Sequence, residues 1–239
     1  MRTDYDPADA PWSAEDLARN LERIAFYTEF TFEAGALIPR ERETPLLKWQ
    51  DPIRYALIGD AVERADVETY AGLARRLSAI TRLPISEATE GAPPNLLVLI
   101  VSREARRRIA ARLDASDAPV DSGLAYRLRG DEYEIPCAAS VRVGEPDGVI
   151  VFGVILIKAE TSGLLRESCA HEEFAQALGP GNDFAGARPS VFNDDQEFAL
   201  LTAHDEALLR VLYDPRLKPG MSRREGMTLA RRVIAELGR

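Results

Sequence analysis

The residues 172–183 concentrate the side chains that could do chemistry, and they read Glu-Glu-Phe-Ala-Gln-Ala-Leu-Gly-Pro-Gly-Asn-Asp. Glu172 and Gln176 are four residues apart, so a helix would present them one turn apart on the same face. Gly179 stops that helix and lets the chain reverse, which brings Asn182 back toward them. The spacing therefore predicts that one carboxylate and two amides converge on one spot.

The same spacing resembles that of the zinc-binding helix of metzincin peptidases. In His-Glu-x-x-His two imidazoles bind one Zn²⁺ and the Glu acts as general base on the bound water, and x-x-Gly-x-x-His then supplies a third ligand. Here Glu172, Gln176 and Asn182 occupy the three ligand positions, and Glu173 occupies the position of the base. The resemblance implies a zincin-like helix without the histidines that bind zinc.

The alternative register, in which His171 begins a His-Glu pair, fits less well. It puts Ala175 at the second ligand position and moves Gly179 one residue out of step. His171 lies ~100° around the helix from Glu172. We therefore expect His171 to face away from the site, as an ordinary exposed or packed histidine.

The residue types also bear on which metal could bind. Zinc in proteins takes Cys, His and carboxylate ligands, so Glu172 with the amides of Gln176 and Asn182 makes a poor zinc site. Hard oxygen donors suit Ca²⁺ better, although Ca²⁺ takes roughly 6–8 oxygens, more than these residues supply. We expect no resident cofactor, with zinc disfavoured and calcium left open. A zinc site from the cysteines with His171 and His204 finds no support in their spacing.

Downstream stretches extend the resemblance. Ser190-Val-Phe192 resembles the Ser-Ile-Met of a metzincin Met-turn, with Phe in place of Met. The Leu-Thr-Ala-His-Asp of 201–205, followed by Leu212-Tyr213, resembles the sequences that open and close the last helix of matrixin-type catalytic domains. These matches occur in the order that a zincin-like fold would need.

Over nearly its full length the chain is similar to a bacterial family known as domain-of-unknown-function family 2927. Its relatives share a Glu-Glu-x-x-Gln-x-Leu-Gly-x-x-Asn-Asp core. This resemblance implies a zincin-like fold and implies that the missing histidines are the habit of the family. It implies no substrate. The further matching stretches are 19–25, 46–49, 213–217 and 219–221.

The predicted fold class is α+β: a single zincin-like domain over residues 1–239, with a mixed twisted sheet, a motif-bearing helix and C-terminal helices. Ser13 with Asp16 and Ser222 with Glu225 form capping boxes at two helix starts. Helices are predicted over 13–33, 164–178, 205–213 and 223–237, and the metzincin-like motif covers 172–183.

Short apolar segments predict the strands. They span 53–58, 84–88, 96–101 and 149–159, with an edge strand around 133–143 that Pro136 interrupts. Two of them, 96–101 and 149–159, are apolar on both faces, so the motif helix must cover one of these strands. A single core is expected to contain Leu97, Leu99, Val151, Val154, Ile155, Leu178 and Leu208.

Composition excludes some partners. The chain has 39 acidic and 30 basic side chains and a formal charge of −9. That excess repels phosphate backbones, so no nucleic acid is expected as a partner. The longest apolar runs are far short of the ~20 residues that cross a bilayer, so no membrane span is expected. No export signal is visible, which predicts a cytoplasmic protein, or an exported or periplasmic one if an export segment has been trimmed.

The two cysteines are compatible with one disulfide in an exported protein or with two buried thiols. Cys169 begins the motif helix, and Cys137 lies in the edge strand that would flank the site. We therefore expect them to be adjacent. A disulfide would close a ~30-residue loop and contribute about 3 kcal/mol in the chain-entropy model.

Three functions are compatible with these features. The first is a pseudo-peptidase that binds a peptide or protein partner, along its edge strand. The second is a metallopeptidase-like hydrolase in which Glu173 is the general base, with an unusual metal or none. The third is a structural envelope domain held by a Cys137–Cys169 disulfide. The absent histidines favour the first.

Overall fold

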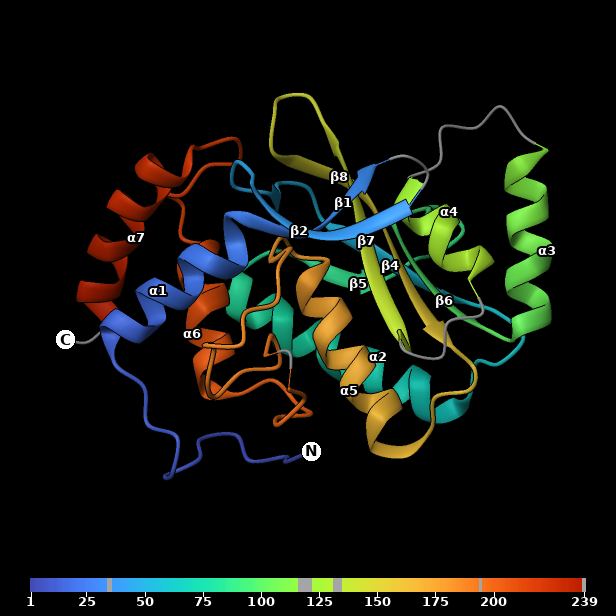
Figure 1. Ribbon diagram of the computed structural model, residues 1–239, viewed down its shortest axis with the longest axis horizontal. Helices are drawn as coiled ribbons and strands as arrows, with labels where there is room; N and C mark the ends of the chain where they lie inside the picture. Colours follow the sequence, from blue (N-terminus) through green and yellow to red (C-terminus); the bar gives the residue numbers. More distant parts are fainter. Residues whose placement is uncertain (34–35, 116–121, 131–134, 194, 238–239) are drawn as a thin grey trace.

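The computed structural model describes residues 1–239 except 34–35, 116–121, 131–134, 194 and 238–239. Figure 1 shows how its helices and strands are arranged. In chain order they are α1 (Ala14–Ala25), β1 (Tyr27–Glu33), β2 (Ala36–Glu43), β3 (Lys48–Trp49), β4 (Ile53–Ile58), α2 (Arg64–Thr81), β5 (Ile85–Glu87), β6 (Leu96–Val101), α3 (Arg103–Asp114), α4 (Ser122–Arg129), β7 (Cys137–Gly144), β8 (Val149–Lys158), α5 (Gly163–Gln176), α6 (Ala203–Leu212) and α7 (Arg223–Leu237).

The central sheet is mixed, which confirms the α+β class. Strands β5, β4, β6 and β8 are neighbours in that order and run parallel, and the short β3 pairs with the first residues of β8. β7 runs antiparallel to β8 on its other side and forms the edge of the sheet. The strands predicted over 53–58 and 96–101 have those bounds in the structure.

The apolar strands divide the interior into two clusters, so the expectation of one core is wrong. Ile155, Leu178 and Leu208 belong to the larger cluster, whereas Leu99 and Val154 belong to a smaller one. Successive residues of a strand point to opposite faces of the sheet, and here both faces are covered. The larger cluster packs α2 and α5 against one face, and the smaller one packs α3 and α4 against the other.

Two of the expected core residues are not fully buried. Leu97 is half-buried, and Val151 is 38% exposed. Val151 lies near the start of β8, before the stretch from Gly153 onward that pairs with β6. Its side chain therefore lies outside the part of the sheet that the helices cover.

The first helix is shorter than predicted. Its start agrees, since Ser13 Oγ accepts the N–H of Asp16 at 3.2 Å and the Asp16 carboxylate accepts the N–H of Ser13 at 2.9 Å. It ends at Ala25, however, and the rest of the predicted helix 13–33 is the strand β1. The segment Tyr-Thr-Glu-Phe-Thr-Phe-Glu is rich in β-branched and aromatic residues and pairs with β2 as an antiparallel hairpin.

The region between α3 and β8 holds the other differences. β7 begins after Pro136, so this proline precedes the strand and does not interrupt it. Residues 133–134 of the predicted edge strand lie outside the described residues. Helix α4 was not predicted. The C-terminal helix has the predicted bounds, 223–237.

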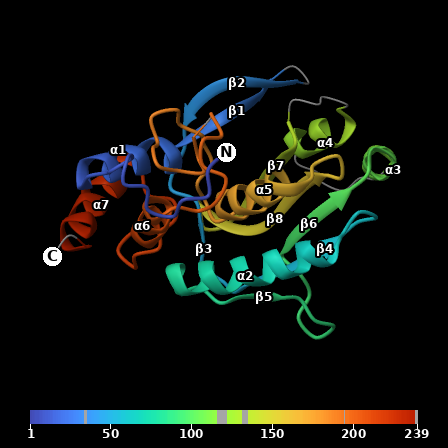
Figure 2. The same cartoon turned by 90° about the horizontal axis from the view of Figure 1, so that it is seen from below.

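The hairpin β1–β2 does not belong to the central sheet. Figure 2 shows it next to α5 and β7, on the side opposite α2 and β5. β2 contacts α4, and β7 contacts α5. The space between the hairpin, the edge strand and the motif helix is where the candidate site lies. In the described part of the chain, no helix is long and apolar enough to cross a membrane.

Candidate functional site

The edge strand and the motif helix are joined covalently. Cys137, the first residue of β7, forms a disulfide with Cys169 of α5, and their Cα atoms are 5.9 Å apart. The predicted adjacency is confirmed. Because the bond lies one turn before Glu173, it holds β7 beside the helix face that carries the motif.

A cavity of about 510 Å³ opens between these elements. This volume is in the range of small-molecule and peptide side-chain sites. The hairpin, α4, β7, α5 and the loops after α5 all contribute to its wall. Its polar lining includes Glu29, Arg127, Ser140, Glu172, Glu173, Gln176, Asp183, Asn193 and Gln196.

Glu173 is the most deeply buried of these polar residues. Its side chain is only 4% exposed, and its Oε2 has no hydrogen-bond partner among the described residues. Burial, followed by the nearby Asp183 carboxylate, raises the pKa of Glu173 to about 8, although Arg127 and the backbone N–H of Ala139 act in the opposite direction. Glu173 is therefore largely protonated at neutral pH.

The three predicted ligand positions do not all converge. Glu172 and Gln176 both line the cavity, as the helix spacing predicts. Asn182 does not: its amide donates to the carbonyl of Arg23 at 3.0 Å and to Glu41 Oε1 at 3.1 Å. The expectation is wrong for this residue.

Asp183 takes the place that was expected of Asn182. The Gln176 amide donates to Asp183 Oδ1 at 2.9 Å. Gly179 permits the turn, because its φ is +129° and a Cβ there would lie 2.1 Å from the carbonyl oxygen of Leu47. The turn thus delivers the next residue along the chain to the cavity. Asp183 is the last residue of the motif stretch 172–183, so its carboxylate could have been chosen from the sequence as a candidate site residue.

These donors do not fit a zinc site. One ligand atom each from Cys137, Glu172 and Glu173 lies within 4.8 Å of the others. The sulfur of Cys137 is in the disulfide and is no thiolate. A metal at Glu173 would have to displace the proton that its raised pKa favours. The other donors are the carboxylates of Glu172 and Asp183 and the neutral amide of Gln176, and the described residues that line the cavity offer no imidazole or thiolate.

His171 faces away from the cavity, as expected. It is buried, and its Nδ1 accepts the backbone N–H of Leu201 at 3.1 Å. Burial, and then the nearby Arg76, lower the pKa of His171 to about 4. The neutral imidazole links the motif helix to the segment that leads into α6.

The two downstream stretches singled out by sequence meet at Asp205. Its Oδ1 accepts the hydroxyl of Ser190 at 2.5 Å, and its Oδ2 accepts the N–H groups of Val191 at 3.2 Å and Thr202 at 2.9 Å. The Thr202 hydroxyl also donates to Oδ2 at 2.9 Å and caps α6. Asp205 thereby fixes the loop before α6.

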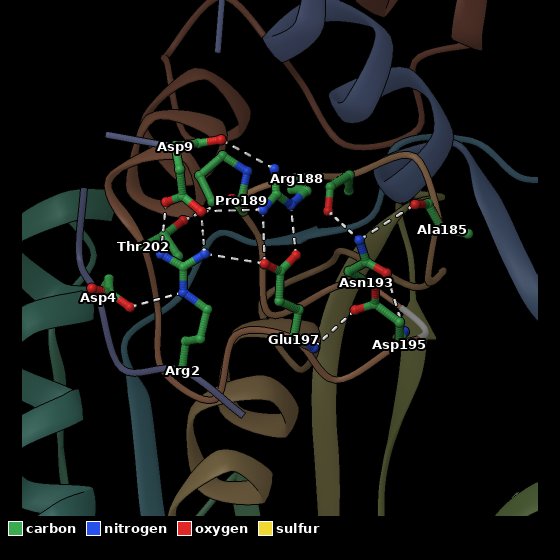
Figure 3. Close-up of polar contacts among 11 residues, drawn as sticks. Arg2, Asp4, Asp9, Ala185, Arg188, Pro189, Asn193, Asp195, Glu197 and Thr202 are labelled. Atoms are coloured by element: carbon green, nitrogen blue, oxygen red, sulfur yellow. Dashed lines mark hydrogen bonds and ion pairs between the residues drawn. The ribbon is translucent and has the colours of Figure 1, made fainter. Parts of the chain in front are cut away.

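The N-terminal segment holds the outer side of the same loop, as Figure 3 shows. Arg2 binds Asp9 at 2.7 Å and Glu197 at 3.2 Å, and Arg188 binds Glu197 at 2.6 Å. Asn193 of this loop, which lines the cavity, donates to the carbonyl of Ala187 at 2.9 Å. The loop wall of the cavity is thus tied down at several points, a role that sequence reasoning did not assign to Arg2 or Arg188.

The outer edge of β7 forms another part of the wall. The N–H of Lys158 donates to the carbonyl of Pro136 at 3.0 Å, so in the register of β7 on β8 the backbone groups of Ala138 and Ser140 also point toward β8. Those of Cys137, Ala139 and Val141 point outward. Among the residues described, no other strand pairs with this edge.

The fold and the site define a class of protein. It is an α+β domain with a mixed sheet, in which a disulfide joins the edge strand to a helix and both line a partly acidic cavity. The chain belongs to the family described as Protein of unknown function (DUF2927), whose model matches residues 14–232. Comparison with curated proteins gave no match.

Proposed function

We propose that this domain is a zincin-like relative of metallopeptidases that binds an extended peptide segment along β7 and does not cleave it with zinc. The observation that carries the proposal is the outward-facing backbone of Cys137 and Val141, which borders the cavity on either side of Ala139, whose N–H bonds the Glu173 carboxyl. An exposed sheet edge can accept an added strand through main-chain hydrogen bonds, and adjoining pockets can then select its side chains.

The altered motif supports the non-catalytic part of the proposal. The Asn182 amide donates to Arg23 and Glu41 outside the cavity, and the Gln176 amide donates to Asp183. The oxygen of a neutral amide is a poor replacement for an imidazole at zinc. Two further stretches support the zincin-like part of the proposal. The stretches around Ser190 and Asp205 contact each other, in the order in which they resemble the Met-turn and last helix of metzincins.

Strand addition is tested by removing one outward N–H. Val141→Pro removes such a group without removing a hydrogen bond to β8, whereas Val141→Ala shortens the side chain and keeps the N–H. The probe is a fluorescent mixture of blocked nonapeptides. We expect binding to Val141→Ala and at least tenfold weaker binding to Val141→Pro, measured by fluorescence anisotropy, with both variants folded by circular dichroism.

A second probe tests whether the main chain of the peptide forms the hydrogen bonds. The same mixture with alternate backbone amides N-methylated cannot form a full set of main-chain hydrogen bonds. It should lose its binding to the unaltered protein. Equal binding of methylated and unmethylated peptides, or of the Pro and Ala variants, would show that β7 does not add a strand.

A hydrolase in which Glu173 acts as general acid and base is the second candidate. It is favoured by one observation, the raised pKa of a buried carboxyl whose Oε2 is unpartnered at the cavity. It predicts slow cleavage of the peptide mixture, detected by mass spectrometry, that Glu173→Gln abolishes. Intact peptides after prolonged incubation at several pH values would exclude it.

A further inference from the structure

We infer that the cavity beside β7 selects a basic side chain, lysine or arginine, from the bound peptide. This inference rests on the peptide-binding function proposed above and adds the chemical class of the ligand. Three features carry it: the charges that line the cavity, the unpartnered oxygen of Glu173, and the apolar part of the wall.

The charged lining is predominantly negative. Four carboxyl side chains contribute from three different places: Glu29 from β1, Glu172 and Glu173 from α5, and Asp183 from the loop that follows. Among the described residues of the lining Arg127 is the one basic side chain, and its guanidinium lies over the ring of Phe30, 4.9 Å from the centroid. A cationic ligand group would meet a complementary surface, and an anionic one would be repelled.

Glu173 provides an independent indication of what is to be bound. Its Oε2 is a buried polar atom without a hydrogen-bond partner in the described part of the chain, and the side chain is only 4% exposed. A buried polar atom of this kind costs stability unless a ligand supplies the missing hydrogen bond. An ammonium or guanidinium group supplies both the donor and the charge that would favour the ionised carboxylate.

The rest of the wall suits the stem of a long basic side chain. Leu47, Leu124, Ile135, Pro136 and Val141 line the same cavity. Lysine and arginine place their methylene groups along apolar surface while the charged end binds polar groups. A volume of about 510 Å³ leaves room for one such side chain next to the peptide backbone.

The register of β7 limits this selection to one peptide position. The side chains of Cys137 and Ala139 lie on the α5 face of the strand, because Cys137 is bonded to Cys169 of that helix and residues two apart share a face. A peptide residue opposite Ala139 presents its side chain on the same face. The N–H of Ala139 already bonds the Glu173 carboxyl, so a peptide residue at this position pairs through the carbonyl of Ala139 alone and lies next to Glu173.

The test compares blocked nonapeptide mixtures that differ only in a fixed central residue: lysine, arginine, acetyl-lysine, norleucine or glutamate. Norleucine keeps the length of the lysine stem without the charge, and acetyl-lysine removes the charge while extending the side chain. We expect the lysine or arginine mixture to bind at least tenfold more tightly than the norleucine, acetyl-lysine and glutamate mixtures, by fluorescence anisotropy.

Two variants locate the effect, and one serves as control. Glu173→Gln and Asp183→Asn each remove a carboxylate with little change in shape and should abolish the preference for a basic residue. Glu90→Gln removes an equivalent charge at an exposed position outside the cavity and should leave the preference intact. A preference that survives in both cavity variants would contradict the inference.

The outcomes separate this inference from the function on which it rests. If all mixtures bind equally, or if norleucine or glutamate is preferred, the selection of a basic residue is wrong and strand addition stands. If no mixture binds at any central residue, both are wrong.

Discussion

Asp205 and Glu173 are both buried acidic residues near the C-terminal half of the fold, and they differ in what surrounds them. Asp205 is 0% exposed and accepts hydrogen bonds from Ser190, Val191 and Thr202. Glu173 is 4% exposed, has an unpartnered Oε2 and lies near further carboxyl groups. A carboxyl group thus stabilises the fold at Asp205 and destabilises it at Glu173.

The difference indicates where a ligand is needed. A buried carboxylate with all its donors in place supports a loop and needs nothing from outside. A buried carboxyl with one oxygen unpartnered lowers stability, and perturbed groups of this kind cluster at functional sites. The comparison therefore predicts that Asp205 serves the fold and that Glu173 serves function, and the following predictions test it.

The largest expected effect is at Asp205. Asp205→Ala removes the acceptor of the Ser190 hydroxyl and of the N–H groups of Val191 and Thr202, and with it the Asp205 half of the capping box of α6. We expect a loss of roughly 3–5 kcal/mol in the free energy of unfolding, measured by urea denaturation. A loss below about 1 kcal/mol would mean that this network does not support the fold.

A smaller effect, of opposite sign, is expected for Glu173→Gln. The pKa of Glu173 is raised in the folded protein, so the folded state binds more protons than the unfolded state between about pH 4.5 and 8. Its contribution to stability therefore falls as the pH rises through this window. Gln does not titrate, so the variant should be more stable at pH 8 by roughly 1–3 kcal/mol.

The measurement is urea denaturation of both proteins at pH 5 and pH 8. The groups that bear on Glu173 are Asp183, Glu29, Arg127 and the buried Tyr70, and all remain in the variant. The stability advantage of Glu173→Gln should be small at pH 5 and larger at pH 8. An equal difference at both pH values would show that Glu173 is not protonated in the folded state at neutral pH.

The smallest effect is expected from metal chelation. Because the donors at the motif do not fit zinc, we expect no stoichiometric zinc by mass spectrometry in protein purified without chelators. EDTA should leave the melting temperature unchanged within about 1 °C, since a bound metal would stabilise the folded state. Calcium binding stays a prediction, and a rise in melting temperature with added Ca²⁺ that EDTA reverses would support it.

Much of the fold was predictable because its signals are local. The capping boxes at Ser13 and Ser222 set helix starts within three residues of sequence, and the strand 96–101 is apolar throughout. The exception is the end of α1 at Ala25. The helical pattern continues past that point, but pairing with β2 takes the next residues into a strand. A contact between strands is not visible in the helical period of one segment.

For the candidate site, the sequence alone determined the helix that carries Glu172, Glu173 and Gln176 and the turn after it, because helical spacing and a glycine with positive φ are properties of neighbouring residues. Only the tertiary structure decided that Asp183 enters the cavity and Asn182 does not, since this depends on how α1 and β2 pack against the turn. It also decided that Glu173 lies buried beside the outer edge of β7 with its Oε2 unpartnered among the described residues. Burial and the absence of a partner depend on segments far apart in the chain, which no local pattern records.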